Sequence, residues 1–151
     1  MRVSICTPTY NRRKYIKKLI QYIHSQDYPL DNIEWLIFDD GTDKIGDLVK
    51  DIPFVKYFHS KTKKPIGFKR QFMNDESTGD IIVNMDDDDM YPKERISHAV
   101  DMLVNNRDIL IVGSSVIHIY YEDTQRVFTF GPYWANHATA GTFAYKKELL
   151  K

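Results

Sequence analysis

Four consecutive aspartates, Asp86 to Asp89, directly follow the apolar run 81–85 and are the residues of this chain best suited to chemistry. Carboxylates this close together repel one another unless a cation neutralises them, and hard divalent cations prefer oxygen ligands. A run of acidic residues is also common at the start of a helix, and a helical pattern does follow Pro92. By itself the run therefore has two interpretations, a metal site that handles phosphate or the first turn of a helix.

Two other polar clusters also close short apolar runs. Residues Thr7 to Asn11 follow the first run of the chain, and Asp39 to Asp43 follow the second. If the runs are parallel strands, their carboxyl ends meet at one edge of the sheet, which is where such sheets bind ligands. We therefore expect all three clusters to open onto one crevice, and this expectation favours the binding-site interpretation of the aspartates.

The elements that must position these clusters follow from the hydrophobic pattern. Short apolar runs alternate with segments whose apolar residues recur at helical spacing. We predict strands at 3–6, 33–38, 54–58 and 81–85, and helices through 15–23, 45–49, 67–77 and 92–105. Such alternation predicts βαβ units, and hence an α/β fold with a mainly parallel central sheet and helices on both faces.

The last third of the chain has a different pattern. We predict a long strand from Ile109 to Ile119, a turn at 121–125 into a strand at 127–130, and an aromatic loop at 131–137. A last strand is expected around Thr139 to Tyr145, with a helix beginning at Lys146. This part of the fold is predicted to be antiparallel.

Composition indicates one soluble globular domain. The chain has 151 residues, of which 42% are hydrophobic and 28% charged, with 21 basic and 21 acidic residues. The balanced charge argues against nucleic acid or an acidic membrane surface as the main partner, and the basic segment 61–64 is interpreted as a solvated loop. Cys6 is the only cysteine, and no run resembles a signal peptide or a membrane span, so we expect a cytoplasmic protein.

Two common nucleotide sites are excluded by their missing motifs. The chain has no Walker-type phosphate loop and no Gly-x-Gly-x-x-Gly after its first strand, so neither a P-loop enzyme nor an NAD-binding domain fits. A carboxylate-bound cation could bridge a diphosphate instead, with Lys69 and Arg70, after Gly67, adding positive charge. A nucleotidyltransferase uses a similar sheet but would need a glycine-rich first loop, which this chain lacks.

Four segments together resemble family 2 glycosyltransferases of the GT-A fold, in order and at similar spacing: Cys6–Asn11, Phe38–Asp43, Gly67–Arg70 and Met85–Asp89. The resemblance implies a Rossmann-like GT-A sandwich forming a single domain, 1–151. Residues from 1 to about 105 would bind the nucleotide sugar, and residues from about 106 to 151 would form a shortened acceptor side. The implied activity is transfer of a sugar from a nucleotide diphosphate sugar, with a UDP-sugar favoured, to an acceptor hydroxyl, usually with inversion and with Mn²⁺ or Mg²⁺.

The resemblance also implies roles for individual residues. Pro8, Thr9 and Tyr10 resemble the wall of the nucleoside pocket, and Arg70 resembles the cation near the base and diphosphate. Asp39 or Asp40 would read the base edge. The complete donor-binding set is Thr7, Pro8, Thr9, Tyr10, Asn11, Asp39, Asp40, Gly67, Lys69, Arg70, Asp86 and Asp87.

The four aspartates allow two registers of the Asp-x-Asp motif, because either Asp86 and Asp88 or Asp87 and Asp89 satisfy it. The first register is preferred. Asp86 would then lie near the ribose and the metal, and Asp88 would be the direct metal ligand.

Inverting transfer also needs a general base that accepts the proton of the acceptor hydroxyl. In the family this base usually follows the strand that Gly141–Tyr145 resembles, and here the chain stops at Lys151. We therefore expect the base beyond Lys151, in a longer enzyme. His137 is a weaker candidate, because a lone loop histidine is more often structural. Without a base, the alternative is a non-catalytic module that binds a nucleotide sugar.

Overall fold

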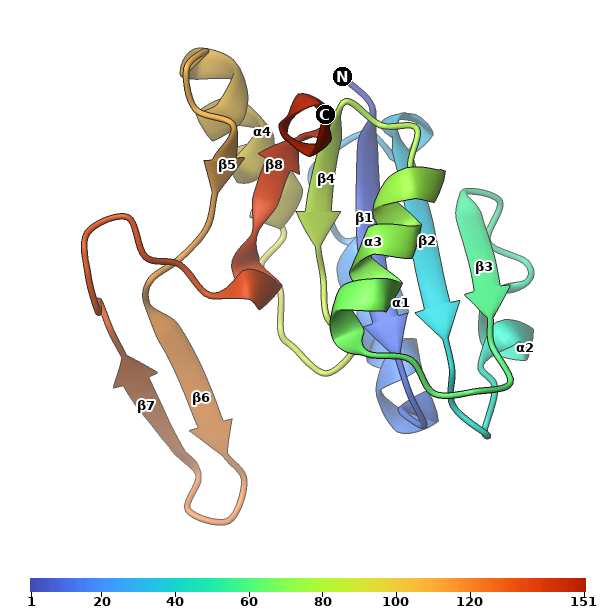
Figure 1. Cartoon of the computed structure of the whole chain (residues 1–151). Coiled ribbons are helices and arrows are strands. Elements are labelled where there is room, and N and C mark those ends of the chain that lie inside the picture. Colours follow the sequence, from blue (N-terminus) through green and yellow to red (C-terminus); the bar gives the residue numbers. More distant parts are fainter.

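A computed structural model describes all residues from 1 to 151. Its main sheet has six strands in the order β3-β2-β1-β4-β8-β5 (Figure 1). The four parallel strands are β1 (Val3–Thr9), β2 (Ile33–Asp39), β3 (Val55–His59) and β4 (Ile81–Asn84). β8 (Ala144–Lys146) runs antiparallel between β4 and β5 (Ile111–Val112).

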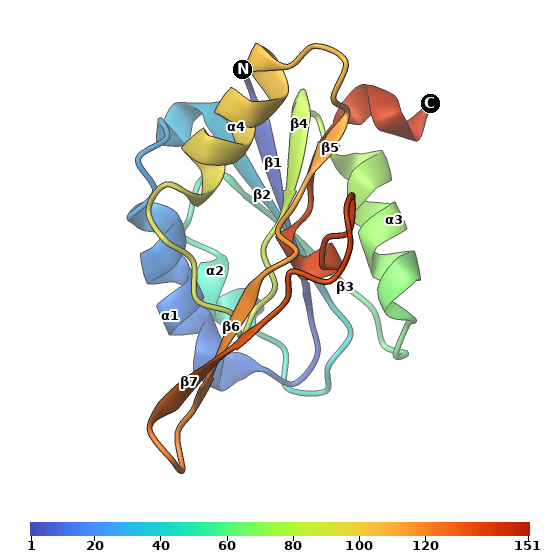
Figure 2. The ribbon, with the colours of Figure 1, turned by 90° about the vertical axis from the view of Figure 1, so that its left-hand side faces the viewer.

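Helices cover both faces of this sheet, so the α/β prediction is confirmed. α1 (Arg13–His24) and α4 (Arg95–Asn105) lie on one face, and α3 (Ile66–Glu76) lies on the other (Figure 2). α2 (Gly46–Val49) is a short helix between β2 and β3, and 3-10 turns occur at η1 (Leu30–Asn32), η2 (Ala140–Thr142) and η3 (Lys147–Leu150). Every residue of β1 and β2 is buried, as expected for strands covered on both faces.

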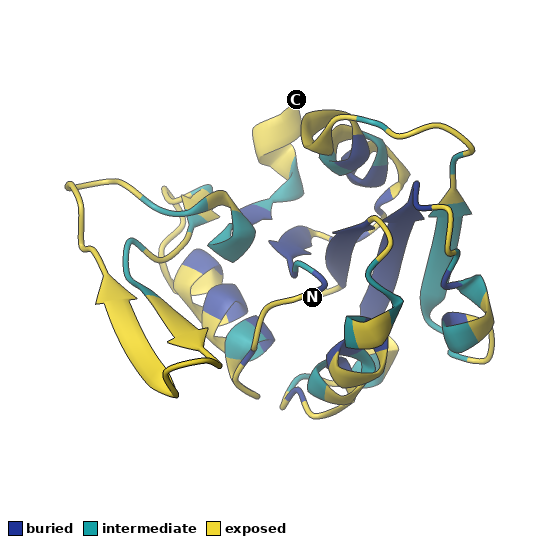
Figure 3. Cartoon of the chain, turned by 90° about the horizontal axis from the view of Figure 1, so that it is seen from below, coloured by how far each residue is buried: buried dark blue, intermediate teal, exposed yellow.

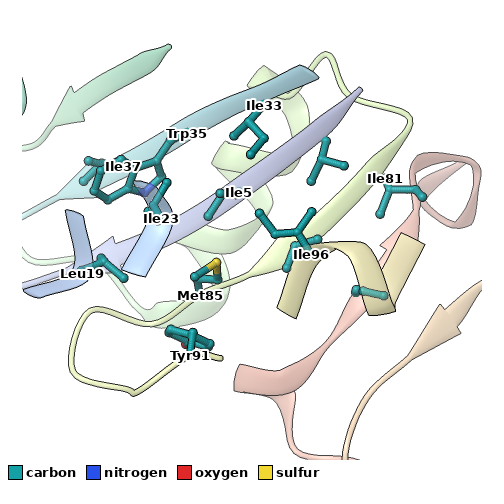
Figure 4. Packing of buried hydrophobic residues seen from close by; sticks show 14 of the residues in the cluster. Ile5, Leu19, Ile23, Ile33, Trp35, Ile37, Ile81, Met85, Tyr91 and Ile96 are labelled. Carbon is teal, nitrogen blue, oxygen red and sulfur yellow. The ribbon is translucent and has the colours of Figure 1, made fainter. Parts of the chain in front are cut away.

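The larger part of the hydrophobic core lies between the sheet and helices α1 and α4. Strand residues such as Ile5 and Trp35 pack there against Leu19 and Ile23 of α1 and Ile96 of α4 (Figure 4). A smaller cluster on the α3 face contains Cys6, Leu36, Phe38, Met73, Ile82 and Tyr145. These two layers hold β1, β2 and β4 rigidly, and therefore fix the positions of the loops that follow them.

The strand order places a topological switch between β1 and β4. From β1 the chain builds β2 and β3 outward on one side, and then returns through α3 to place β4 on the other side of β1. Ligands of doubly wound sheets bind at the carboxyl end of such a switch. Here that edge is formed by the residues that follow Thr9, Asp39 and Asn84.

Four predictions for elements after residue 90 are wrong. The long strand 109–119 is interrupted after Val112, because the Ser114 hydroxyl bonds both the backbone N–H and the carbonyl of Val116, and the next strand begins at Ile117. The strand expected from Thr139 is a 3-10 turn until Thr142, so β8 covers only 144–146 and the expected terminal helix is a 3-10 turn. α4 begins at Arg95, three residues after Pro92.

A second, two-stranded sheet projects from the body. It consists of β6 (Ile117–Tyr121) and β7 (Arg126–Phe130), and almost all of its residues are exposed (Figure 3). The antiparallel prediction for this region is confirmed. The longest helix, α1, has 12 residues, and no helix has the length and apolar character required to cross a bilayer.

Candidate functional site

The three polar clusters lie at the same edge of the sheet and are bonded to one another. Asn11 has a left-handed backbone, with φ at 53°, and its side-chain oxygen accepts the backbone N–H groups of Thr42 at 2.7 Å and Asp43 at 3.1 Å. A Cβ at Gly41 would lie 2.5 Å from the Asn11 nitrogen, so only glycine allows this approach. Asn11 therefore locks the first loop to the second.

Asp39 organises its own loop. One carboxylate oxygen accepts the backbone N–H of Gly41 at 2.9 Å, and the other accepts the N–H of Ile45 at 3.0 Å and the hydroxyl of Tyr57 at 2.6 Å. The residue is completely buried. Both oxygens are engaged, so in this conformation Asp39 offers no free oxygen to a nucleobase.

Asp40 is engaged in the same way. Its carboxylate forms a short, buried ion pair with the Lys69 ammonium and accepts the backbone N–H of Lys64 at 2.6 Å. Lys69 also donates to the carbonyl of Thr9 at 3.1 Å. Asp40 thus ties α3 and the loop before it to the end of β1, and base reading by this carboxylate stays a prediction that requires the Lys64 segment to move.

Tyr10 presents an accessible aromatic face beside positive charge. The ring is 36% exposed, and the Lys63 and Lys69 ammonium groups lie 4.3 Å and 5.8 Å from its centroid. Gly67, in the first turn of α3, leaves open space where a side chain would stand. A planar base can stack on such a ring, and the Lys63 ammonium adds positive charge beside it.

The acidic run is divided between two arginines. Asp86 faces α3 and accepts from Arg70 at 3.2 Å, whereas Asp88 faces the start of α1 and accepts from Arg12 at 2.7 Å. In this conformation no three carboxylate, histidine or cysteine side chains gather around one point that could hold a metal ion. Asp86 and Asp88, the two aspartates of the preferred register, thus face different elements, and their role in holding a cation stays a prediction.

The charge of the run still suits a hard cation. The pKa of Asp87 is raised to about 6, mainly by burial, and the negative charges of Asp88 and Asp86 act in the same direction against the positive charge of Arg12. Burial and the same two neighbours raise the pKa of Asp89. The donors are all carboxylate oxygens, and Mg²⁺ is commonly held by one or two carboxylates together with substrate phosphates. Asp86 and Asp88 therefore fit a Mg²⁺ or Mn²⁺ ion.

Unpartnered polar atoms identify the crevice independently of any motif. Buried polar groups in native proteins are nearly always hydrogen-bonded. Four buried side-chain atoms in this chain have no hydrogen-bond partner in the protein: Thr9 Oγ1, Arg70 Nε, Asn84 Oδ1 and Asp87 Oδ2. All four belong to the carboxyl ends of β1 and β4, to the acidic run, or to the first part of α3. Their concentration marks the place where a ligand would complete the hydrogen bonding.

Two of the expected site residues do not face this crevice. The Thr7 side chain is buried, donates to the Met85 carbonyl at 2.7 Å and accepts from Trp35 Nε1 at 2.9 Å, so it couples β1 to the start of the acidic run. His137 lies in the exposed loop after β7, where its ring contacts Tyr133 at a centroid distance of 5.3 Å. The His137 side chain forms no hydrogen bond or ion pair with the acidic run, and its role as a base stays a prediction.

The structure adds residues that sequence reasoning missed: Arg12, Asn84, Tyr91, Arg95 and Gly141. Arg12 directly follows the first polar cluster, and Asn84 is a polar residue inside an apolar strand, so both carried a local signal. Gly141 carried none, because its approach to Asp86 joins segments 55 residues apart in the chain.

The switch point and the strand order define a doubly wound α/β protein, a class whose ligands bind at this edge of the sheet. Residues 4–149 match the family model described as Glycosyl transferase family 2. The chain therefore belongs to glycosyl transferase family 2, and the resemblance seen in its motifs is confirmed.

Several curated relatives support this assignment. A dolichyl-linked diacetamido-dideoxy-glucuronosyltransferase from Methanococcus voltae is 35% identical over 54% of this chain and 27% of its own length. A GalNAc(5)-diNAcBac-PP-undecaprenol beta-1,3-glucosyltransferase from Campylobacter jejuni is 30% identical over 68% of this chain and 33% of its own length. Poly(ribitol-phosphate) beta-N-acetylglucosaminyltransferase TarS from Staphylococcus aureus is 25% identical over all of this chain and 28% of its own length. The chain thus spans about a third of these relatives.

Solved structures show the same fold. TarS 1-349 in complex with UDP superposes with a TM-score of 0.77 at 21% identity, over 99% of this chain and 48% of that chain. Mannosyltransferase PcManGT from Pyrobaculum calidifontis, in complex with GDP-Man and Mn²⁺, gives 0.75 at 20% identity, over 99% of this chain and 45% of that chain. The GT-A fold expected from the motifs is therefore confirmed.

Proposed function

We propose that this chain binds a nucleoside diphosphate sugar, with a UDP-sugar favoured, and transfers its sugar with inversion to an acceptor hydroxyl, assisted by Mn²⁺ or Mg²⁺. The observation that carries the proposal is the group of four unpartnered buried polar atoms around the acidic run. Membership of glycosyl transferase family 2, and the UDP and GDP-Man complexes of its structural neighbours, support it.

The nucleoside would lie against Tyr10. Its ring is exposed at the end of β1, and the Lys69–Asp40 ion pair holds the preceding Thr9 carbonyl in place. Base stacking on an aromatic face needs such a fixed, accessible ring. Thr9 Oγ1, buried and without a partner, would complete the polar contacts of the nucleoside.

The diphosphate would lie between Arg70 and the acidic run. Arg70 Nε is buried and unpartnered, and a phosphate oxygen is a strong acceptor for a guanidinium N–H. Asp86 and Asp88 would hold the divalent cation, which supplies positive charge to the leaving diphosphate as the glycosidic bond breaks. Arg70 would add to this charge from the other side of Asp86, since the two residues are already in contact.

Calorimetric titration of UDP, GDP and dTDP, with and without Mn²⁺, tests three parts of the proposal together: the nucleotide pocket, the preferred nucleobase and the metal requirement. We expect UDP to bind, and Mn²⁺ to strengthen this binding at least about tenfold, because the cation offsets repulsion between diphosphate and carboxylates. The Asp88→Asn variant should lose the Mn²⁺ enhancement yet fold normally, since its pair with Arg12 is half-exposed and such pairs contribute about 0–1 kcal/mol.

The matched control is Asp43→Asn, which removes an exposed carboxylate paired with Arg13 at 2.8 Å on the same edge. This variant should keep the Mn²⁺ enhancement. Absence of nucleotide binding in the unmodified chain, with or without metal, would contradict the proposed function. A transfer and hydrolysis assay with labelled UDP-sugars then separates an enzyme from a module that only binds the donor.

A further inference from the structure

Tyr91 is the buried tyrosine whose hydroxyl contacts the acidic run. The Asp86 backbone N–H donates to this hydroxyl at 2.5 Å, and the hydroxyl donates to Asp89 Oδ2 at 3.4 Å. Its ring is 9% exposed and lies beside Met85 at the end of the core cluster (Figure 4). One side chain therefore joins the first and last aspartates of the run and is itself held by core packing.

The opposite side of the run is also fixed. Arg95 donates to the carbonyl of Asn84, at the end of β4, and to the carbonyls of Thr142 and Phe143 at 2.9 Å and 3.2 Å. These bonds dock the 140–142 turn against the strand that leads into the aspartates. A Cβ at Gly141 would lie 2.9 Å from Asp86 Oδ2 and 3.7 Å from Asp89 Oδ2, so the turn touches the same two carboxylates.

Asp86 is thus held by two contacts, the Tyr91 hydroxyl at its backbone and Arg70 of α3 at its carboxylate, and Gly141 leaves no room for a side chain beside Oδ2. The Tyr91 hydroxyl is the contact that packing does not require, because a phenylalanine ring would fill the same space. Residues that orient metal ligands in this way typically change metal affinity about 10–100-fold when removed.

We propose that Tyr91 is a positioning residue for the cation site of the acidic run. Its single hydroxyl fixes both the Asp86 backbone and the Asp89 carboxylate. The inference rests on the proposed function, because it assumes a divalent cation at Asp86. It assigns Tyr91 no contact with the substrate or the cation.

Titration of Mn²⁺ alone, followed by the electron paramagnetic resonance signal of the free ion, measures the effect without any turnover. Tyr91→Phe should weaken Mn²⁺ binding about tenfold relative to the unmodified chain. The matched control is Tyr145→Phe, which removes another buried tyrosine hydroxyl, bonded to Asn74 at 2.8 Å under α3. Both variants should lose similar thermal stability, but only Tyr91→Phe should lose Mn²⁺ affinity.

A second variant approaches Asp86 from the other side. Gly141→Ala places a methyl group against Asp86 Oδ2. Gly141 does not have the left-handed backbone that Gly131 has, so its conformation also allows alanine. We expect weaker Mn²⁺ binding here as well. If Tyr91→Phe and Gly141→Ala bind Mn²⁺ as tightly as Tyr145→Phe does, the inference is overturned. The proposed function would stay intact in that case. A lack of Mn²⁺ binding in the unmodified chain, also in the presence of UDP, would overturn the metal role and the inference together.

Discussion

At the scale of single residues, the crevice depends most on the ion pair between Lys69 and Asp40. The side chains are 7% and 0% exposed, and the Lys69 ammonium also holds the Thr9 carbonyl. A buried ion pair contributes little compared with a well-packed apolar pair, but loss of one partner leaves an uncompensated charge. Asp40 in particular could not regain water without opening the Lys64 loop, which its second oxygen holds.

Lys69→Met should therefore lower the free energy of unfolding by about 3–5 kcal/mol, measured by urea denaturation. The double variant Asp40→Asn with Lys69→Met should recover much of this loss, because it removes the buried charge and keeps an acceptor for the Lys64 N–H. Lys93→Met, which breaks an exposed pair with Glu94 at 3.7 Å, serves as the control and should change stability by less than about 1 kcal/mol. A Lys69→Met variant as stable as this control would contradict the assigned role of the pair.

Residue types predicted that the three polar clusters lie at one edge of the sheet, but not the hydrogen-bond partners of each residue. Asp39 and Asp40 were expected to read a base because they follow a strand, and they do lie at the crevice. Their oxygens are taken by the Gly41 and Ile45 N–H groups of the same loop, and by Tyr57, Lys64 and Lys69 from β3, the following loop and α3. No local pattern reveals the last three partners, since they come from segments 18 to 29 residues away.

At the scale of elements, a second polar network joins the strands at the end of the sheet opposite the crevice. Glu34, on β2, is 1% exposed and accepts from the Ser4 hydroxyl of β1 at 2.6 Å and from Lys56 of β3 at 2.7 Å. It also accepts from the Thr78 hydroxyl at 2.8 Å, in the turn that leads into β4. One carboxylate thus connects all four parallel strands.

This network makes stability sensitive to acid. Burial alone would raise the pKa of Glu34, but hydrogen bonds from Lys56, Ser4 and Thr78 outweigh it and lower the pKa from 4.5 to about 2. A carboxylate whose pKa is lowered on folding contributes its stability above pH 4.5 and loses it as the pH falls towards 2. The shift corresponds to about 3 kcal/mol.

Urea unfolding at pH 7 and at pH 3 should show this directly. Glu34→Gln should be less stable than the unmodified chain at pH 7, and the difference should shrink at pH 3. Glu94→Gln, at an exposed carboxylate, should match the unmodified chain at both values. A Glu34→Gln deficit that stays constant with pH would rule out the ionised carboxylate as the source of the stability.

The hairpin β6–β7 is the element with the least packing against the rest of the protein. All five residues of β7 and four of the five in β6 are exposed, and an isolated two-stranded sheet is at best marginally stable. Its backbone amides should exchange with deuterium at least about 100-fold faster than those of β1, where every residue is buried. Mass spectrometry of peptides covering 117–130 and 3–9 measures this, and equal protection of both would show that the hairpin is held by contacts absent from this structure.

The elements differ in how far the sequence predicted them. β1, β2 and β4 were predicted because buried parallel strands are largely apolar runs bounded by turn residues, and the partly buried edge strand β3 was predicted from its apolar residues at 54–58. The split of 109–119 was not, because the bend comes from one hydroxyl, that of Ser114, which bonds the backbone of Val116. The last strand was expected around Thr139 to Tyr145, but its extent was wrong, because only the three residues that pair with β4 and β5 have strand geometry.

At the scale of the whole molecule, the crevice is where the separate elements of the domain meet. The loops after β1, β2 and β4 and the first turns of α3 all contribute to it, and each continues directly into a strand or helix of the core. A ligand bound there would bridge these loops. Its binding free energy would then add to the stability of the folded domain as a whole.

UDP and Mn²⁺ together should therefore raise the midpoint of thermal unfolding. A ligand at about 100 times its Kd stabilises the native state by about 2.7 kcal/mol, which corresponds to roughly 5–10 °C for a domain of this size. Either ligand alone should give a smaller shift. Without the cation, the diphosphate and the carboxylates repel one another, and without UDP, the cation lacks its phosphate ligands. Asp88→Asn should reduce the combined shift to that of UDP alone, whereas Asp43→Asn should keep it in full. Equal shifts for UDP with and without Mn²⁺ would show that the nucleotide binds without using the acidic run, since a shared site must couple the two affinities reciprocally.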